Sequence, residues 1–149
     1  MRSKTLFGYI FLCGVFLFLD RLLKWSATLG PLVKTHLLNP YFGWEPFFNK
    51  GIAFGIPVAR PLVFVLTIFI IGSVLYFYYQ NEKSPGAGGG AGLRTGLALV
   101  LAGAISNLVD RIIYGHTIDY VRIFTGVINL ADVFIVTGFI LYFSSLKRS

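Results

Sequence analysis

Two aspartates in the last third of the chain, Asp119 and Asp132, lie in or beside very hydrophobic sequence without an obvious local counter-ion. An ionised carboxylate near a bilayer core is costly, so such a residue is usually retained for a function. Two carboxyl groups that are brought together can share one proton and activate a water molecule. The chemistry to expect from this pair is therefore acid–base hydrolysis.

The acids of the first and third spans have neighbours that would keep them ionised. Asp110 adjoins Arg111, and Asp20 has Arg21 beside it and Lys24 one helical turn later. Asp119 belongs to the segment 117–123, which alternates like a strand and would turn the side chain of residue 122 to the opposite face. Asp119 and Asp132 are thus the acids expected to have raised or coupled pKa values, a marker of catalysis. A helix N-terminal cap or an interfacial charge is the alternative for each.

The composition places these residues in a membrane. Of the 149 residues 56% are hydrophobic and 17% are aromatic, and the mean hydropathy is +0.75. We expect an all-α integral membrane protein with four transmembrane helices, forming a single domain over residues 1–149. The predicted spans are 6–23, 62–79, 93–113 and 127–143.

The first span also has the basic start of a secretory signal. It continues into Asp20 and Arg21 without a small-residue cleavage site, so a retained helix is favoured over a cleaved signal. Cys13 within it is the only cysteine, which excludes an intramolecular disulfide and favours a packing role.

Two connections differ in kind. The segment 25–60 is long and aromatic and carries the glycine-punctuated run 49–55, so it predicts a small β-like element on the extracytoplasmic surface. The segment 84–92 has no side chain larger than proline and predicts a flexible connector.

The charges predict the orientation. Four spans place both termini and the connector on one face with six basic residues against Glu82, and the positive-inside rule makes that face cytoplasmic. The other five acids then lie on the extracytoplasmic side. The net charge of +7 is explained by topology and by attraction to anionic membrane lipids. The scattered bases argue against nucleic-acid binding.

Counting along the spans predicts a polar layer. Asp20, Asn107 and Asn129 each lie 14 residues from the cytoplasmic end of a predicted span, which is roughly 21 Å in a helix. Asn129 and Asp132 are at i, i+3 and would share a helix face, and Asp20 can pair with Lys24 at i, i+4.

The third span adds a polar face of its own. Gly103, Asn107 and Arg111 follow each other at i, i+4, i+8, and the glycine would allow a close approach of a neighbouring helix. All of these polar faces must point into the bundle, because lipid cannot solvate them.

In these residues the sequence resembles the signal peptidase II family, the lipoprotein signal peptidases. The resemblance covers the chain from Asp20 to Asp132 in order and spacing. Small departures are Ile128 and Tyr120 where phenylalanine is common, and a short interval between the two aspartates. The matching motifs are Asp20 with Lys24, Asn49-Lys50-Gly51-Ile52-Ala53-Phe54-Gly55, Gly103 with Asn107 to Arg111, Asp119, and Asn129 with Asp132.

The resemblance implies an aspartyl endopeptidase of the bacterial inner membrane, with its active site on the extracytoplasmic side. It would cut prolipoproteins N-terminal to a diacylglyceryl-modified cysteine, use Asp119 and Asp132 as catalytic dyad, need no metal or cofactor and be inhibited by globomycin. The other site residues would bind substrate, orient the dyad or shape the polar wall, with Arg111 alternatively paired to Asp110. They are Asp20, Lys24, Asn49, Gly51, Asn107, Arg111 and Asn129.

Two other functions remain as alternatives. A small proton-coupled transporter also places acids in a membrane, but it needs a polar pathway to both faces, and the second span is uncharged. A serine or metal hydrolase has little support, because His36 and His116 are the only imidazoles and Ser106 lacks a base. We interpret His116 as a solvated turn residue.

Overall fold

The structure, a computed structural model, describes residues 2–29, 35–38, 41–52, 56, 58–83 and 90–146. Residues 53–55 of the glycine-punctuated run and 84–89 of the predicted connector lie outside the described residues. The elements in chain order are α1 (Arg2–Leu29), β1 (Thr35–Leu38), β2 (Phe42–Asn49), α2 (Arg60–Lys83), α3 (Ala91–Tyr114), β3 (Thr117–Ile123), β4 (Gly126–Ile128) and α4 (Leu130–Leu146).

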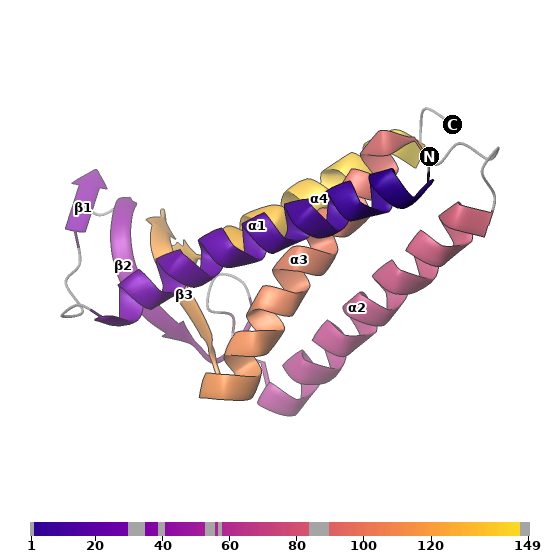
Figure 1. Cartoon of the computed structure of the whole chain (residues 1–149). Helices are drawn as coiled ribbons and strands as arrows, with labels where there is room; N and C mark the ends of the chain where they lie inside the picture. Colours follow the sequence, from indigo (N-terminus) through magenta and orange to yellow (C-terminus); the bar gives the residue numbers. More distant parts are fainter. Residues whose placement is uncertain are drawn as a thin grey trace.

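Helix α3 is the centre of the bundle. It packs against α1, α2 and α4, and the small sheet lies at one end of the helices (Figure 1). The start of α1 and the end of α4 lie together at the opposite end (Figure 1). This arrangement places the polar ends of α1, α3 and α4 next to β3.

The contact between α3 and α4 depends on glycines. A Cβ atom added to Gly96 would lie 2.6 Å from the carbonyl oxygen of Gly138 and 2.8 Å from the backbone nitrogen of Tyr142. A Cβ on Gly103 would overlap the carbonyl of Ala131. The close helix approach predicted at Gly103 is therefore confirmed, and it involves α4.

The four strands form one antiparallel sheet in the order β1-β2-β3-β4. Asp119 of β3 pairs with Phe47 of β2, next to an irregularity in β2 between Trp44 and Phe47. Gly115 makes the turn from α3 into β3 at φ 73°, a left-handed conformation that favours glycine. The expected sheet-like element and the expected strand over 117–123 are thus present.

Two predicted boundaries were wrong. Helix α1 continues to Leu29, so residues 25–29 belong to the helix and not to the outer element. Residues 127–128 are the end of β4, and α4 begins at Leu130. Asn129 therefore precedes the helix instead of sharing one of its faces, and the helical depth count does not apply to it.

Two helices of the described chain, α2 over Arg60–Asn81 and α3, are long and apolar enough to cross a membrane, and α4 is a shorter apolar helix. Helix α1 is long but carries charged residues near both ends. The described chain is thus mostly helical with a small antiparallel sheet, and the count of four spans stays a prediction.

Candidate active site

Asp119 lies in β3 with a side chain that is completely buried. Its two oxygens accept hydrogen bonds from side-chain amides, Oδ2 from Asn49 Nδ2 at 2.8 Å and Oδ1 from Asn129 Nδ2 at 2.6 Å. Burial and the nearby charge of Asp132 raise the pKa of Asp119 to about 7, while the two amide donors act in the opposite direction. This carboxyl group can therefore exchange a proton near neutral pH.

Asp132 lies in the first turn of α4 and forms a reciprocal cap with Asn129. The backbone N–H of Asp132 donates to Asn129 Oδ1 at 3.0 Å, and Asp132 Oδ2 accepts the backbone N–H of Asn129 at 3.3 Å. This is the geometry of a capping box. The helix-cap alternative is thus realised for Asp132, and its second oxygen, Oδ1, still accepts Asn107 Nδ2 at 2.9 Å.

Asn129 and Asn107 connect the two aspartates. The amide nitrogen Nδ2 of Asn129 donates to Asp119 and also to Asn107 Oδ1 at 3.1 Å, and Asn107 in turn donates to Asp132. The structure therefore brings together Asp119, Asp132, Asn107 and Asn129, which come from β3, α3 and the start of α4.

Each amide in this network has its orientation set by a group that can only donate. Asn107 Oδ1 faces the ammonium of Lys24 at 3.0 Å, and Asn129 Oδ1 accepts the backbone N–H of Asp132. Asn49 Oδ1 accepts the backbone N–H of Gly51 at 2.9 Å. Because each oxygen is used in this way, each Nδ2 must point toward an aspartate.

Lys24 supports the network from α1 with a side chain that is only 1% exposed. Its ammonium lies 2.8 Å from Asp20 Oδ2 and 2.7 Å from Asp110 Oδ2. It also donates to Ser106 Oγ at 3.3 Å, and Ser106 donates to Asp20 at 2.5 Å. The predicted Asp20–Lys24 pair is present, and it forms part of a larger buried cluster.

The partner predicted for Asp110, Arg111, was wrong. Its carboxylate is bound by Arg21 at 2.5 Å and by Lys24, and it accepts the backbone N–H of Ile118 at 3.2 Å. Arg111 donates to Thr67 Oγ1 at 3.2 Å instead of pairing with Asp110. The alternative that Arg111 serves only as the counter-ion of Asp110 was therefore wrong.

Tyr120 is a site residue that the sequence did not single out for a role. Its hydroxyl donates to Asp20 Oδ1 at 3.0 Å and accepts the backbone N–H of Leu130 at 3.0 Å. Burial and the charge of Asp20 raise the pKa of this hydroxyl. Asp20 also accepts the N–H of Ala131 at 3.2 Å. Side chains thus satisfy the first-turn donors of α4, which would otherwise lack partners.

Two neighbours of the site, Arg122 and His116, contact side chains of β2. Arg122 pairs with Glu45 of β2, so it does not neutralise Asp119. His116 lies in the turn between α3 and β3, as predicted, but it is half-buried and packs against Phe48 with ring centroids 4.9 Å apart and ring planes tilted by 53°. Among the described residues no group of three histidine, cysteine or acidic side chains could hold a metal ion. The side chain of His36 lies outside what the structure describes.

The chain has close similarity to known proteins over nearly its whole length. The family model described as "Signal peptidase (SPase) II" matches residues 12–147. A lipoprotein signal peptidase of Janthinobacterium sp. is 30% identical, covering 98% of this chain and 92% of that protein. A lipoprotein signal peptidase of Mesorhizobium japonicum is 33% identical, covering 93% and 83%.

Solved structures support the fold. A bacterial membrane enzyme determined by the in meso method superposes with a TM-score of 0.79 at 21% identity, covering 95% of this chain and 88% of that one. A second structure described in the same words gives a TM-score of 0.76, also at 21% identity, over 95% and 94%. The comparisons favour the peptidase function and give no support to the transporter alternative.

Proposed function

The chain belongs to the signal peptidase II family and is an aspartic-type membrane peptidase that cleaves lipoprotein signal peptides, and from this premise we propose that Asp119 and Asp132 are its catalytic pair. One observation carries the proposal. Two carboxyl groups from separate elements, β3 and α4, are connected by a continuous set of hydrogen bonds through Asn129 and Asn107. The amides of this set have a fixed orientation, which is the preorganisation that hydrolysis needs.

In the proposed reaction the pair starts with one proton. The ionised carboxylate takes a proton from a water molecule, and the water oxygen attacks the carbonyl carbon of the scissile peptide bond. The protonated carboxyl group gives its proton to the carbonyl oxygen, which forms a gem-diol. The other carboxyl group then gives the proton it took from water to the leaving amine, while the first carboxylate takes a proton back from the gem-diol. The carbon–nitrogen bond then breaks, and the products are a signal peptide with a new carboxylate and a lipoprotein with a new amino terminus. No step requires a metal or a cofactor.

The proton balance of the pair supports this mechanism. Since the pKa of Asp119 lies at about 7, the two carboxyl groups together keep one proton up to neutral pH and lose it above that range. The apparent pKa values belong to the pair and not to one residue. The active form is the one with a single proton.

We propose that the remaining site residues hold the substrate and orient the pair. The loop that starts with Asn49 and Gly51 would receive the peptide in an extended form, with Asn49 linking this loop to Asp119. Arg111, half-buried at the end of α3, would bind a backbone carbonyl. Asn107 and Asn129 would orient the carboxyl groups, while Asp20 and Lys24 would form the polar wall behind them.

The substrates we propose are prolipoproteins whose cysteine carries a diacylglyceryl group, cut on the N-terminal side of that cysteine. The two acyl chains would lie against the exposed apolar surfaces of the helix bundle. Membrane lipids are therefore neighbours of the site, and globomycin-type inhibitors are expected to bind there.

The membrane arrangement follows from the same proposal. All 149 residues would form one domain with four spans in the bacterial inner membrane, and both termini would be cytoplasmic. The sheet and the aspartates would then face the extracytoplasmic side. Cysteine accessibility in intact cells tests this, using Cys13→Ser protein with single cysteines introduced at Ser3 and Tyr41. Labelling of position 41 but not of position 3 by an impermeant reagent is expected.

The activity is tested with purified protein and a synthetic precursor peptide. A precursor with a diacylglyceryl-modified cysteine should be cut, and the same peptide with an unmodified cysteine should be cut far more slowly. Equal rates for both peptides would contradict the proposed substrate. Proton flux into liposomes that rose with added precursor would instead revive the transporter alternative.

A further inference from the structure

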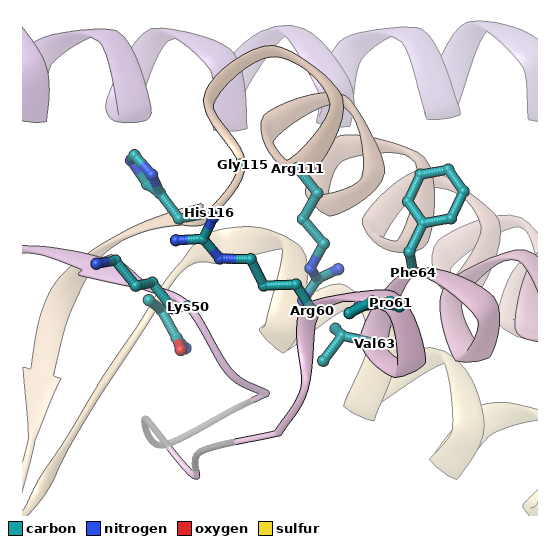
Figure 2. A pocket seen from close by; sticks show the side chains of 9 residues that line it. Lys50, Arg60, Pro61, Val63, Phe64, Arg111, Gly115 and His116 are labelled. Carbon is teal, nitrogen blue, oxygen red and sulfur yellow. The ribbon is translucent and has the colours of Figure 1, made fainter.

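A pocket lies beside the aspartates, between the end of β2, the start of α2 and the turn from α3 into β3. Its volume is about 240 Å³. Figure 2 shows that Lys50, Arg60 and His116 extend along one side of it, while Val63 and Phe64 of α2 lie on the other. The pocket also borders Asn49, whose amide binds Asp119, so it adjoins the catalytic pair.

The charged side of this pocket is cationic. No aspartate or glutamate is among the described residues that line it. The ion pairs of the described part of the chain include neither Lys50 nor Arg60. Arg111 also lines the pocket, but its guanidinium donates a hydrogen bond to Thr67, and its positive charge is attracted to the carboxylates of the site. The two exposed cations Lys50 and Arg60 thus have charge available for an anion.

The other side of the pocket is apolar and continues onto the membrane-facing surface of α2. Phe64 is 41% exposed, and its neighbours Leu62 and Val65 are also exposed. Helix α2 over Arg60–Asn81 is one of the two described helices that are long and apolar enough to span a membrane, and Arg60 is its first residue. A ligand that fills both sides must carry an anionic group next to hydrocarbon. A phospholipid has this chemistry, whereas a free phosphate uses only the cationic side.

We propose that this pocket binds the phosphate of an anionic phospholipid, with Lys50 and Arg60 as its ligands and the acyl chains along Phe64 and its exposed neighbours Leu62 and Val65 of α2. The bound lipid would lie next to Asn49 and would form one edge of the peptidase site. The inference does not depend on which residues catalyse hydrolysis.

The test counts lipids bound to purified protein by native mass spectrometry. Micelles doped with phosphatidylglycerol are compared with micelles doped with phosphatidylcholine at the same mole fraction. The wild-type protein should retain phosphatidylglycerol preferentially, and the double variant K50Q/R60Q should bind it roughly tenfold more weakly. The matched control is Lys83→Gln, which removes one exposed cation from the other end of α2 and should change nothing.

Three results of the lipid comparison would overturn the proposal. They are equal retention of both lipids by the wild type, unchanged phosphatidylglycerol binding in K50Q/R60Q, and an equal loss in the Lys83→Gln control. A further arm uses inorganic phosphate in undoped micelles, and binding of phosphate as tight as that of the lipid would reject a lipid site.

Because Lys50 and Arg60 are exposed, the thermal midpoint of the double variant without lipid should equal that of the wild type. If it does not, Arg60→Gln alone serves as the variant. Since cleavage is not the readout, failure here is distinguishable from failure of the catalytic pair.

Discussion

Asn129 shows how one residue can serve folding and chemistry together. Its side-chain oxygen caps α4 through the N–H of Asp132, and its amide nitrogen binds Asp119. The capping interaction fixes which atom of the amide faces the carboxylate. The Asn-x-x-Asp motif is therefore both a helix start and a connection between the two aspartates.

The pKa of Asp119 leads to a prediction for the pH dependence of cleavage. Below about 7 the pair keeps its shared proton, and above this value the proton is lost. The rate of cleavage should therefore fall as pH rises through about 7. Asn49 donates to the ionised form, so Asn49→Ala removes a stabilisation of the charge and should move this alkaline limb to higher pH.

The measurement is kcat/KM against pH for both proteins, because this ratio reports the pKa values of the free enzyme, with Asn81→Ala as the matched control. Asn81 is half-buried on α2, and within the described part of the chain its amide donates to the carbonyl of Phe77 in its own helix. The control should keep the wild-type limb. A limb that stays in place or moves to lower pH in Asn49→Ala would reject the electrostatic account.

Lys24 is predicted to be essential for stability as well as for orientation. Lys24→Met leaves the buried carboxylates of Asp20 and Asp110 without the ammonium group that pairs with both. Breaking a buried ion pair by removing one partner typically costs about 3–5 kcal/mol. The free energy of unfolding in detergent should fall by that order. Lys83→Met removes an exposed lysine that lies over the ring of Tyr79, and the expected cost is below about 1 kcal/mol. Equal small losses in both variants would show that the cluster around Lys24 is not a buried ionic centre.

At the scale of elements, the glycines between α3 and α4 determine how closely the two halves of the site approach. Asn107 is on α3 and Asp132 on α4, and their 2.9 Å hydrogen bond requires this close contact. Backbone atoms of α4 fill the space beside Gly96. A side chain there would separate the helices and weaken the site from a distance.

Gly96→Ala is therefore expected to destabilise the protein, because the added Cβ meets backbone that cannot rotate away. Overpacking of this kind costs about 1–3 kcal/mol, which a thermal unfolding curve in detergent would detect. Gly72→Ala is the matched control, since nothing lies within 4 Å of a Cβ at that position of α2. It should be neutral or slightly stabilising because alanine favours helix. A loss of stability in Gly72→Ala equal to that in Gly96→Ala would contradict the packing argument.

The elements also show what could be predicted from the sequence. Hydropathy was sufficient for the positions of α2 and α3, and alternation was sufficient for β3, because both patterns are local. The start of α4 was placed too early because Val127 and Ile128 are apolar in a strand as they would be in a helix. The end of α1 was also missed, since Trp25 and its neighbours resemble interfacial loop sequence.

For the whole molecule, local charge patterns singled out Asp119 and Asp132 as the candidate pair, because the lack of neighbouring counter-ions is visible in the sequence, and their catalytic role stays a prediction. The partners of the other acids were only partly predictable. Lys24 reaches Asp110 across 86 positions of sequence, and Tyr120 reaches Asp20 across 100. Such contacts depend on how α1, α3 and β3 pack together. The sequence indicates only that a buried carboxylate needs hydrogen-bond donors, and it does not show which residues supply them. The membrane arrangement remains a prediction from charge.

The central claim is that Asp119 and Asp132 perform the hydrolysis together. The most direct test is single-turnover cleavage of a diacylglyceryl-modified precursor by Asp119→Asn, Asp132→Asn and the double variant, with Glu45→Gln as the control acid that pairs with Arg122. Each single variant should lose at least about 10³-fold in rate, because a pair that acts as a unit fails when either member is removed. The double variant should be hardly slower than either single variant, and Glu45→Gln should retain activity within about tenfold. Cleavage near the wild-type rate by either single variant, with the variant folded in the membrane, would contradict the account.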